Sequence, residues 1–150
     1  MKLALKYGLI ITTGVILWTI IAHTLVPNPQ SIVHSLGAFA FFNILQFSCI
    51  FLGIKALERE QDSQPTFKQG IKQGVSISFV YAITAAFYFA IVLLVIGAKW
   101  MAAEARPDVP MWLVALQAFA GLTVMAMLLG LVYSTLISFV LARRLSERED

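Results

Sequence analysis

The chain has 150 residues, of which 59% are hydrophobic and 13% are charged, and its formal net charge is +3. Ordinary soluble domains contain about 25% charged residues, so this composition excludes a water-soluble globular fold. The positive charge does not indicate a nucleic-acid partner, because the basic residues stand at the ends of apolar runs, where they anchor membrane helices.

Charged residues lie in four short segments, and the three runs between these segments contain none: residues 7–54, 73–98 and 109–142. A bilayer core of about 30 Å needs about 20 apolar residues in a helix. The first run is long enough for two such helices. The segment Pro27-Asn28-Pro29-Gln30 divides it between them. The sequence therefore predicts an all-α, multi-pass membrane protein with a single membrane domain over residues 1–150.

The first span is predicted over residues 7–26, and we expect it to stay on the mature chain. A cleavable signal peptide needs small residues at positions −1 and −3, but Ile20 lies two positions before Ala22. Small or polar residues recur on this span at steps of four, seven and four, which favours a left-handed contact with another helix. They are Gly8, Thr12, Thr19 and His23.

The second span is predicted over residues 33–54 and contains two amides, Asn43 and Gln46, three positions apart near mid-membrane. This spacing places them on one face of a helix. Strongly polar side chains at such a depth usually hydrogen-bond across helices, each bond contributing on the order of 1 kcal/mol. We favour interhelical bonding over the alternative, a pair that binds a solute.

The only histidines, His23 and His34, flank the turn between the first two spans. Two imidazoles at similar depth could titrate near neutral pH or share a metal. The lone Cys49 lies about two thirds of the way down the second span and is too far away to be a further ligand. We therefore favour interfacial anchoring for both histidines, and we expect no metal or other cofactor.

The third span is predicted over residues 71–97 and follows a repeat, in which Lys68-Gln69-Gly70 recurs as Lys72-Gln73-Gly74. The step of four continues as a stripe of small residues, which lets helices approach closely in lipid. Each step turns an α-helix through about 400°. The stripe therefore drifts, and either the helices cross with a right hand or two partners share it. Its members are Gly70, Gly74, Ser78, Ala82, Ala86 and Ala90.

The fourth span is predicted over residues 110–141 and contains a second stripe of this kind. Whether the two stripes pair within one chain or between two copies is left open. About 30 helical residues would reach about 45 Å, so the excess tilts, lies along the outer interface or projects into the cytoplasm. The stripe consists of Ala126, Gly130, Ser134, Ser138 and Ala142.

Lysine and arginine are distributed unequally between the two sides of the predicted spans. Nine lie at the N-terminus, in the loop between the second and third spans, or at the C-terminus, against two, Lys99 and Arg106, on the opposite side. Cytoplasmic loops are enriched in basic residues, so both termini are predicted to be cytoplasmic. The short first connection predicts a compact bundle of four antiparallel helices.

Motifs of known enzymes are missing from the sequence. No acidic residue lies within a predicted span, so neither a proton relay nor paired carboxylates can be placed in the membrane. There is no metalloprotease motif and no phosphate-binding glycine loop. We therefore expect no enzymatic activity.

Three segments resemble a known family: "LKYGLIITTGVIL" at the start, "LGIKALERE" after the second span, and "PTFKQGIKQGVSIS" at the third. They are similar to small bacterial membrane proteins of domain-of-unknown-function family 4199, in which a Gly-Ile-Lys segment and a Thr-Phe…Gly…Gly segment bracket the central loop. The resemblance covers about residues 1–142. It implies four helices in a bacterial inner membrane, and it implies no activity and no functional residues.

These observations favour a structural or accessory membrane protein that self-associates or joins a larger membrane complex. The small-residue stripes and the lack of reactive groups motivate this hypothesis. The alternative is a passive transporter or channel for a small neutral or lipophilic molecule, with Asn43, Gln46 and Gln117 lining the path. A membrane enzyme is the third hypothesis. The lipid bilayer is the expected partner in every case.

Overall fold

A computed structural model of the protein describes residues 2–25, 32–96 and 109–149. Four α-helices make up almost all of this part. Each is long and apolar enough to cross a membrane, and the described residues contain no strand. The predicted all-α fold, with four helices that are each able to span a membrane, is therefore confirmed for the described residues. The helices are α1 (Lys2–Leu25), α2 (Ile32–Gln61), α3 (Phe67–Ile96) and α4 (Met111–Glu149).

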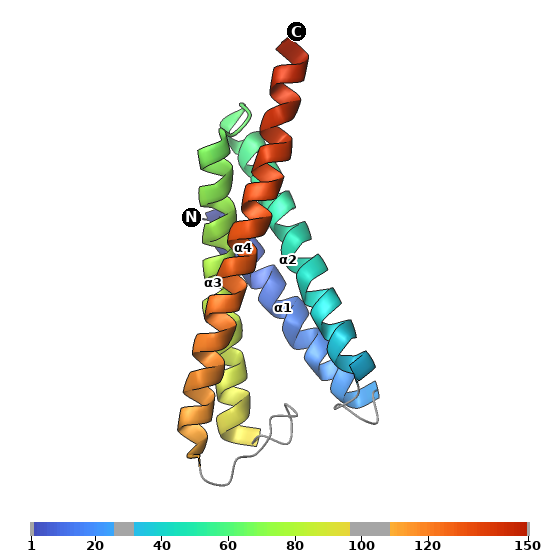
Figure 1. Cartoon of the computed structure of the whole chain (residues 1–150), viewed down its shortest axis with the longest axis vertical. Coiled ribbons are helices and arrows are strands. Elements are labelled where there is room, and N and C mark those ends of the chain that lie inside the picture. Colours follow the sequence, from blue (N-terminus) through green and yellow to red (C-terminus); the bar gives the residue numbers. More distant parts are fainter. Residues whose placement is uncertain (1, 26–31, 97–108, 150) are drawn as a thin grey trace.

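Helices α2 and α4 extend beyond the predicted spans. The charged segment after Ile54, predicted as a loop, continues α2 to Gln61. At the other end of the chain, α4 continues to Glu149, and Figure 1 shows its last turns projecting beyond the other helices. Helix α4 is therefore longer than the predicted span at its C-terminal end. A charged sequence ends the membrane span without ending the helix, because Lys, Arg and Glu are good helix formers.

The turn between α2 and α3 is short because both helix ends are capped. Asp62 follows α2 with a φ of 49°, the left-handed conformation that commonly ends a helix. Thr66 and Gln69 form a capping box. The backbone N–H of Gln69 donates to Thr66 Oγ1 at 3.3 Å, and that of Thr66 donates to Gln69 Oε1 at 2.8 Å. This capping box explains why α3 begins at Phe67, four residues before the predicted start of the membrane span at Ile71.

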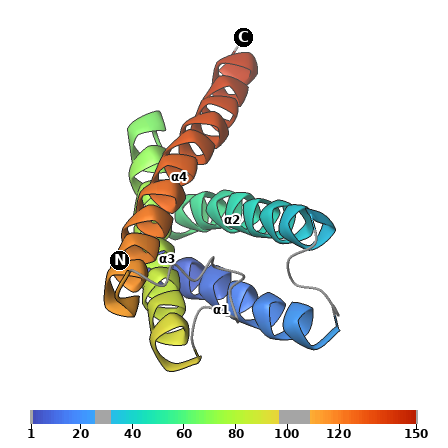
Figure 2. The same ribbon diagram turned by 60° about the horizontal axis from the view of Figure 1, so that its bottom comes forward.

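Helix α3 is the central element of the molecule. Its largest contact is with α4, and it also packs on α1 and α2. Helices α1 and α2 form a second pair, in which Trp18 stacks on Phe41 with ring centroids 4.6 Å apart. Figures 1 and 2 show that the α1–α2 pair diverges from the α3–α4 pair toward the turn joining α1 to α2. The bundle is therefore less compact than the sequence predicts.

The core lies where the two pairs meet, around Ile11, Ile50 and Ile77, which are all fully buried. Large apolar side chains are exposed on all four helices, among them Val95 on α3 at 77%. In water such exposure would be costly, but in a bilayer these side chains contact lipid. The distribution of burial therefore fits the membrane location that the composition predicts.

Candidate functional site

The small-residue stripes of α3 and α4 face each other within one chain, with a glycine opposite a serine in three places: Gly70 opposite Ser138, Gly74 opposite Ser134, and Gly130 opposite Ser78. A methyl group on Gly74 would lie 2.7 Å from Ser134 Cβ, and one on Gly70 would lie 3.1 Å from Ser138 Cβ. Only glycine allows the backbones to approach this closely. Residue numbers rise along α3 as they fall along α4, so the two helices run in opposite directions.

Helix α2 forms a third wall along the same contact. A methyl group on Gly74 would lie 2.9 Å from Ile50 Cγ2, one on Gly70 would lie 3.8 Å from Ile54 Cγ2, and one on Gly130 would lie 3.2 Å from Gln46 Nε2. Two helices therefore share the α3 stripe, which is one of the two solutions that the drift of the stripe allows. We call this region the α2–α3–α4 junction. Its three layers are Ile54/Gly70/Ser138, Ile50/Gly74/Ser134 and Gln46/Ser78/Gly130.

The α3 stripe continues beyond the third layer as alanines. Ala82 and Ala86 are 1% and 0% exposed, whereas Ala90 is half-buried. On α4, Ala126 packs against the core, and Ala142 is half-buried at the other end of that stripe. Ala82 and Ala126 border a small cavity of about 110 Å³. Close packing therefore loosens on the far side of the third layer.

Two of the three serines of the junction bond to their own helices. Ser78 Oγ donates to the carbonyl of Gly74 at 3.0 Å, and Ser134 Oγ donates to the carbonyl of Gly130. Each hydroxyl is thus satisfied by a glycine four residues earlier, which suits a site without water. Ser138 is 3% exposed, and its hydroxyl has no partner among the described residues.

Gln46 connects three helices at the third layer. Its side chain is 2% exposed. The amide Nε2 donates to the backbone carbonyl of Ala126 on α4 at 2.9 Å and to Ser78 Oγ on α3 at 3.4 Å. Backbone carbonyls within a helix already accept one bond, so the Ala126 carbonyl uses its second lone pair. The geometry at Gln46 is that of an interhelical bond rather than of a group open to a solute.

Asn43, which lies about one turn before Gln46 on α2, also bonds to α4. The hydroxyl of Tyr133 donates to Asn43 Oδ1 at 2.5 Å, while Asn43 Nδ2 donates to the carbonyl of Phe39 at 2.6 Å. The ring of Tyr133 also meets Phe47 edge-on, with centroids 5.6 Å apart. The two amides of α2 therefore both reach α4, Gln46 through a backbone carbonyl and Asn43 through a phenol.

A separate polar contact joins α1 to α3. Thr12 Oγ1 and Thr84 Oγ1 lie 2.5 Å apart, and Thr12 also donates to the carbonyl of Gly8 at 3.1 Å. A methyl group on Gly8 would lie 2.6 Å from Val80 Cβ. The predicted contact face of the first span thus packs on α3 at two of its positions. Sequence reasoning missed Thr84, although a hydroxyl in the middle of an apolar span was the available signal.

The remaining predicted residues stay apart from the junction. Gln117 is exposed on α4, nine residues before Ala126, or about 14 Å along the helix. It therefore does not join Asn43 and Gln46 around one path. Thr19 bonds only to its own helix, through the carbonyl of Val15 at 2.8 Å.

The histidines cannot be placed in a site. The backbones of His23 and His34 belong to α1 and α2, but their side chains lie outside the described residues. Within the described part of the chain, no group of three or more potential metal ligands occurs.

The junction brings together glycines, hydroxyls and carboxamides, and its three layers contain no charged side chain. Such groups can pack closely and exchange hydrogen bonds, and neither an acid nor a base is present there. No family model, no curated protein and no solved structure matches the chain.

Proposed function

We propose that this protein is a non-enzymatic, structural or accessory subunit of a membrane assembly, which self-associates or joins a larger complex. The observation that supports the proposal is the α2–α3–α4 junction. Gln46 bonds there to both neighbouring helices, and glycines close the space between the helices. An interior of this kind fixes the positions of helices, and the amide nitrogens of Asn43 and Gln46 both donate to groups of the protein itself.

The proposed topology is an antiparallel four-helix bundle with both termini in the cytoplasm of a bacterium. The basic residues of the loop between α2 and α3 support it through the enrichment of Lys and Arg in cytoplasmic loops. The resemblance to domain-of-unknown-function family 4199 supports the bacterial inner membrane as the location, and membership of that family is part of the proposal.

A partner would contact the outer faces of the bundle, because the small-residue stripes are occupied within the chain. Leu17 on α1 is 53% exposed and Val132 on α4 is 51% exposed. These two side chains lie on different helices, so together they test two outer faces of the bundle. The turns of α4 beyond Ala142 offer a further surface outside the apolar span.

Site-specific cross-linking in native membranes tests the proposed association. A Cys49→Ala background would receive Leu17→Cys or Val132→Cys, and the buried Ile11→Cys would serve as the control. We expect a specific cross-linked species from at least one exposed position and none from Ile11. A chain that stays monomeric and without partner from both exposed positions would contradict the proposal.

Cysteine labelling tests the topology separately. Ser63 lies exposed in the turn between α2 and α3, and Ser63→Cys can be introduced into the same Cys49→Ala background. A membrane-impermeant maleimide should label the cysteine at position 63 only after the membrane has been permeabilised. Labelling of intact cells would place this turn outside and would refute the cytoplasmic termini, whatever the cross-linking shows.

A further inference from the structure

An apolar groove runs between α2 and α4 on the outside of the bundle, close to the end that holds the α2–α3 turn. It has a volume of about 370 Å³. Because α2 and α4 are membrane spans, the groove opens to lipid chains rather than to water. Its lining residues are Phe47, Phe51, Leu136, Ile137, Val140 and Leu141.

Basic side chains stand at the mouth of this groove. On α2, the step of four that places Phe47 and Phe51 in the groove continues to Lys55 and Arg59. The Nζ atom of Lys55 lies 5.5 Å from the centre of the Phe51 ring. From Phe47 to Lys55 the helix rises about 12 Å, which is the length of roughly half an extended acyl chain.

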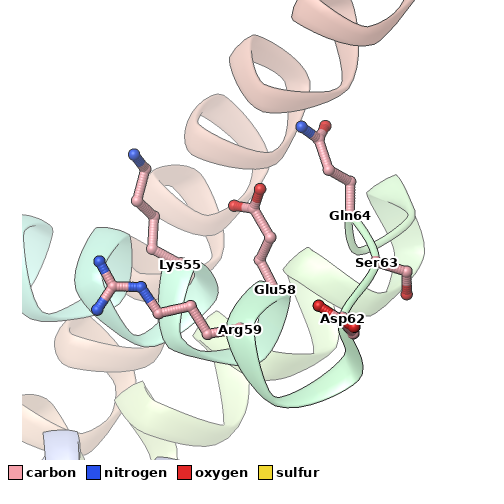
Figure 3. Close-up of a pocket in the computed structure, with 6 residues that line it drawn as sticks. All are labelled: Lys55, Glu58, Arg59, Asp62, Ser63 and Gln64. Atoms are coloured by element: carbon pink, nitrogen blue, oxygen red, sulfur yellow. The ribbon is translucent and has the colours of Figure 1, made fainter.

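The two cations share a polar hollow with two acidic residues and two uncharged polar residues. Lys55, Arg59, Glu58 and Asp62 surround a shallow polar hollow of about 500 Å³ that also includes Ser63 and Gln64. Figure 3 shows the amine of Lys55 and the guanidinium of Arg59 in the left part of the view, the Glu58 carboxylate in the middle and Asp62 to the right. Lys55, which also contacts the ring of Phe51, connects this hollow to the end of the groove.

We propose that this groove binds one anionic phospholipid from the leaflet next to the α2–α3 turn. An acyl chain would lie along Phe47 and Phe51, and the phosphate would lie between Lys55 and Arg59. Charge complementarity selects the headgroup, because a zwitterionic lipid carries no net charge for the two cations to attract. The acyl groove distinguishes this site from general attraction of a basic loop to the membrane surface.

Binding can be measured by native mass spectrometry of the purified protein in detergent. The protein is titrated with an anionic phospholipid and, separately, with a zwitterionic phospholipid that has the same acyl chains. The test of the headgroup site is Lys55→Gln with Arg59→Gln. Its control is Lys68→Gln with Lys72→Gln, which removes the same charge from exposed residues that line neither hollow. We expect the first pair to weaken binding of the anionic lipid by about tenfold or more, and the control by less than about twofold.

The acyl-chain site is tested with Val140→Trp, which fills the groove without changing the charge. Val132→Trp is the control, since Val132 is equally exposed on α4 but does not line the groove. We expect only Val140→Trp to reduce binding of the anionic lipid. Three results would each overturn the site. They are an equal loss of lipid binding in the two double variants, the same affinity for the anionic and the zwitterionic lipid, and no effect of Val140→Trp. These results do not depend on whether the chain has a protein partner, so they separate the site from the proposed function.

Discussion

Gly74 and Ser134 face each other across the contact of α3 and α4 so closely that a methyl group on Gly74 would lie 2.7 Å from Ser134 Cβ. The same methyl group would lie 2.9 Å from Ile50 Cγ2 on α2. Ser134 Cβ is bonded directly to the backbone of α4, and Ile50 Cγ2 lies only one bond further from the backbone of α2, so neither atom can move far unless its helix moves. Any residue larger than glycine at this position therefore pushes three helices apart.

Gly74→Ala should destabilise the protein by about 1–3 kcal/mol, the usual cost of overpacking, and Gly74→Leu or Gly130→Leu should cost more. The matched control is Gly121→Ala, because a methyl group there meets nothing within 4 Å. That control should be neutral or stabilising, since alanine favours a helix by about 1 kcal/mol. Thermal unfolding in detergent measures all four variants. Equal melting temperatures for Gly74→Leu, Gly130→Leu and the parent would contradict the packing role.

Gln46→Met should lower stability by about 0.5–2 kcal/mol, because it removes the bonds to Ala126 and Ser78 at nearly constant volume. Gln117→Met makes the same chemical change at an exposed position and should have little effect. The comparison uses unfolding in detergent at a fixed detergent concentration. If both variants lose the same stability, the bond to Ala126 contributes nothing specific.

Asn43 and Tyr133 should be energetically coupled through their hydrogen bond of 2.5 Å. A double-mutant cycle with Asn43→Leu and Tyr133→Phe isolates this term. We expect a coupling energy of about 0.5–2 kcal/mol, the range found for such bonds in membrane proteins. Additive effects of the two substitutions would show that the side chains do not interact in the membrane.

Thr66→Ala should loosen the first turn of α3, because it removes the hydroxyl that accepts from the Gln69 N–H. The loss of such a cap costs about 1 kcal/mol. Hydrogen exchange at the amides of Gln69 and Gly70, which both donate to Thr66, should therefore become about fivefold faster. Ser63→Ala in the same turn is the control and should leave these rates unchanged. Unaltered exchange in Thr66→Ala would mean that the cap does not hold the turn.

The helices could be predicted from the sequence because charge and hydropathy alternate over long runs. The interior contacts were harder to predict. The step of four located Gly70, Gly74 and Gly130, since close approach in lipid requires small residues. The pattern did not identify the partner helix, because a stripe of glycine and serine suits a second copy of the chain equally well.

The predicted membrane spans did not give the ends of the helices, and no pattern gave the long-range pairing of side chains. The end of α2 at Gln61 was missed, because charged residues end a membrane span but favour a helix. The capping box of Thr66 and Gln69 is present in the sequence as T-x-x-Q and marks the start of α3 at Phe67, outside the predicted membrane span. The pairing of Asn43 with Tyr133 joins residues 90 positions apart, and no periodicity predicts it.

The layered junction also sets the order in which the protein can be completed. Its α4 half follows its α3 half by about 50–70 residues in the chain, which takes several seconds at about 5–20 residues per second of synthesis. Ser78 is already satisfied during this interval by the carbonyl of Gly74. Gln46 can bond to Ser78 during this interval, but its bond to the carbonyl of Ala126 and the bond of Asn43 to Tyr133 form only after the last helix has been inserted.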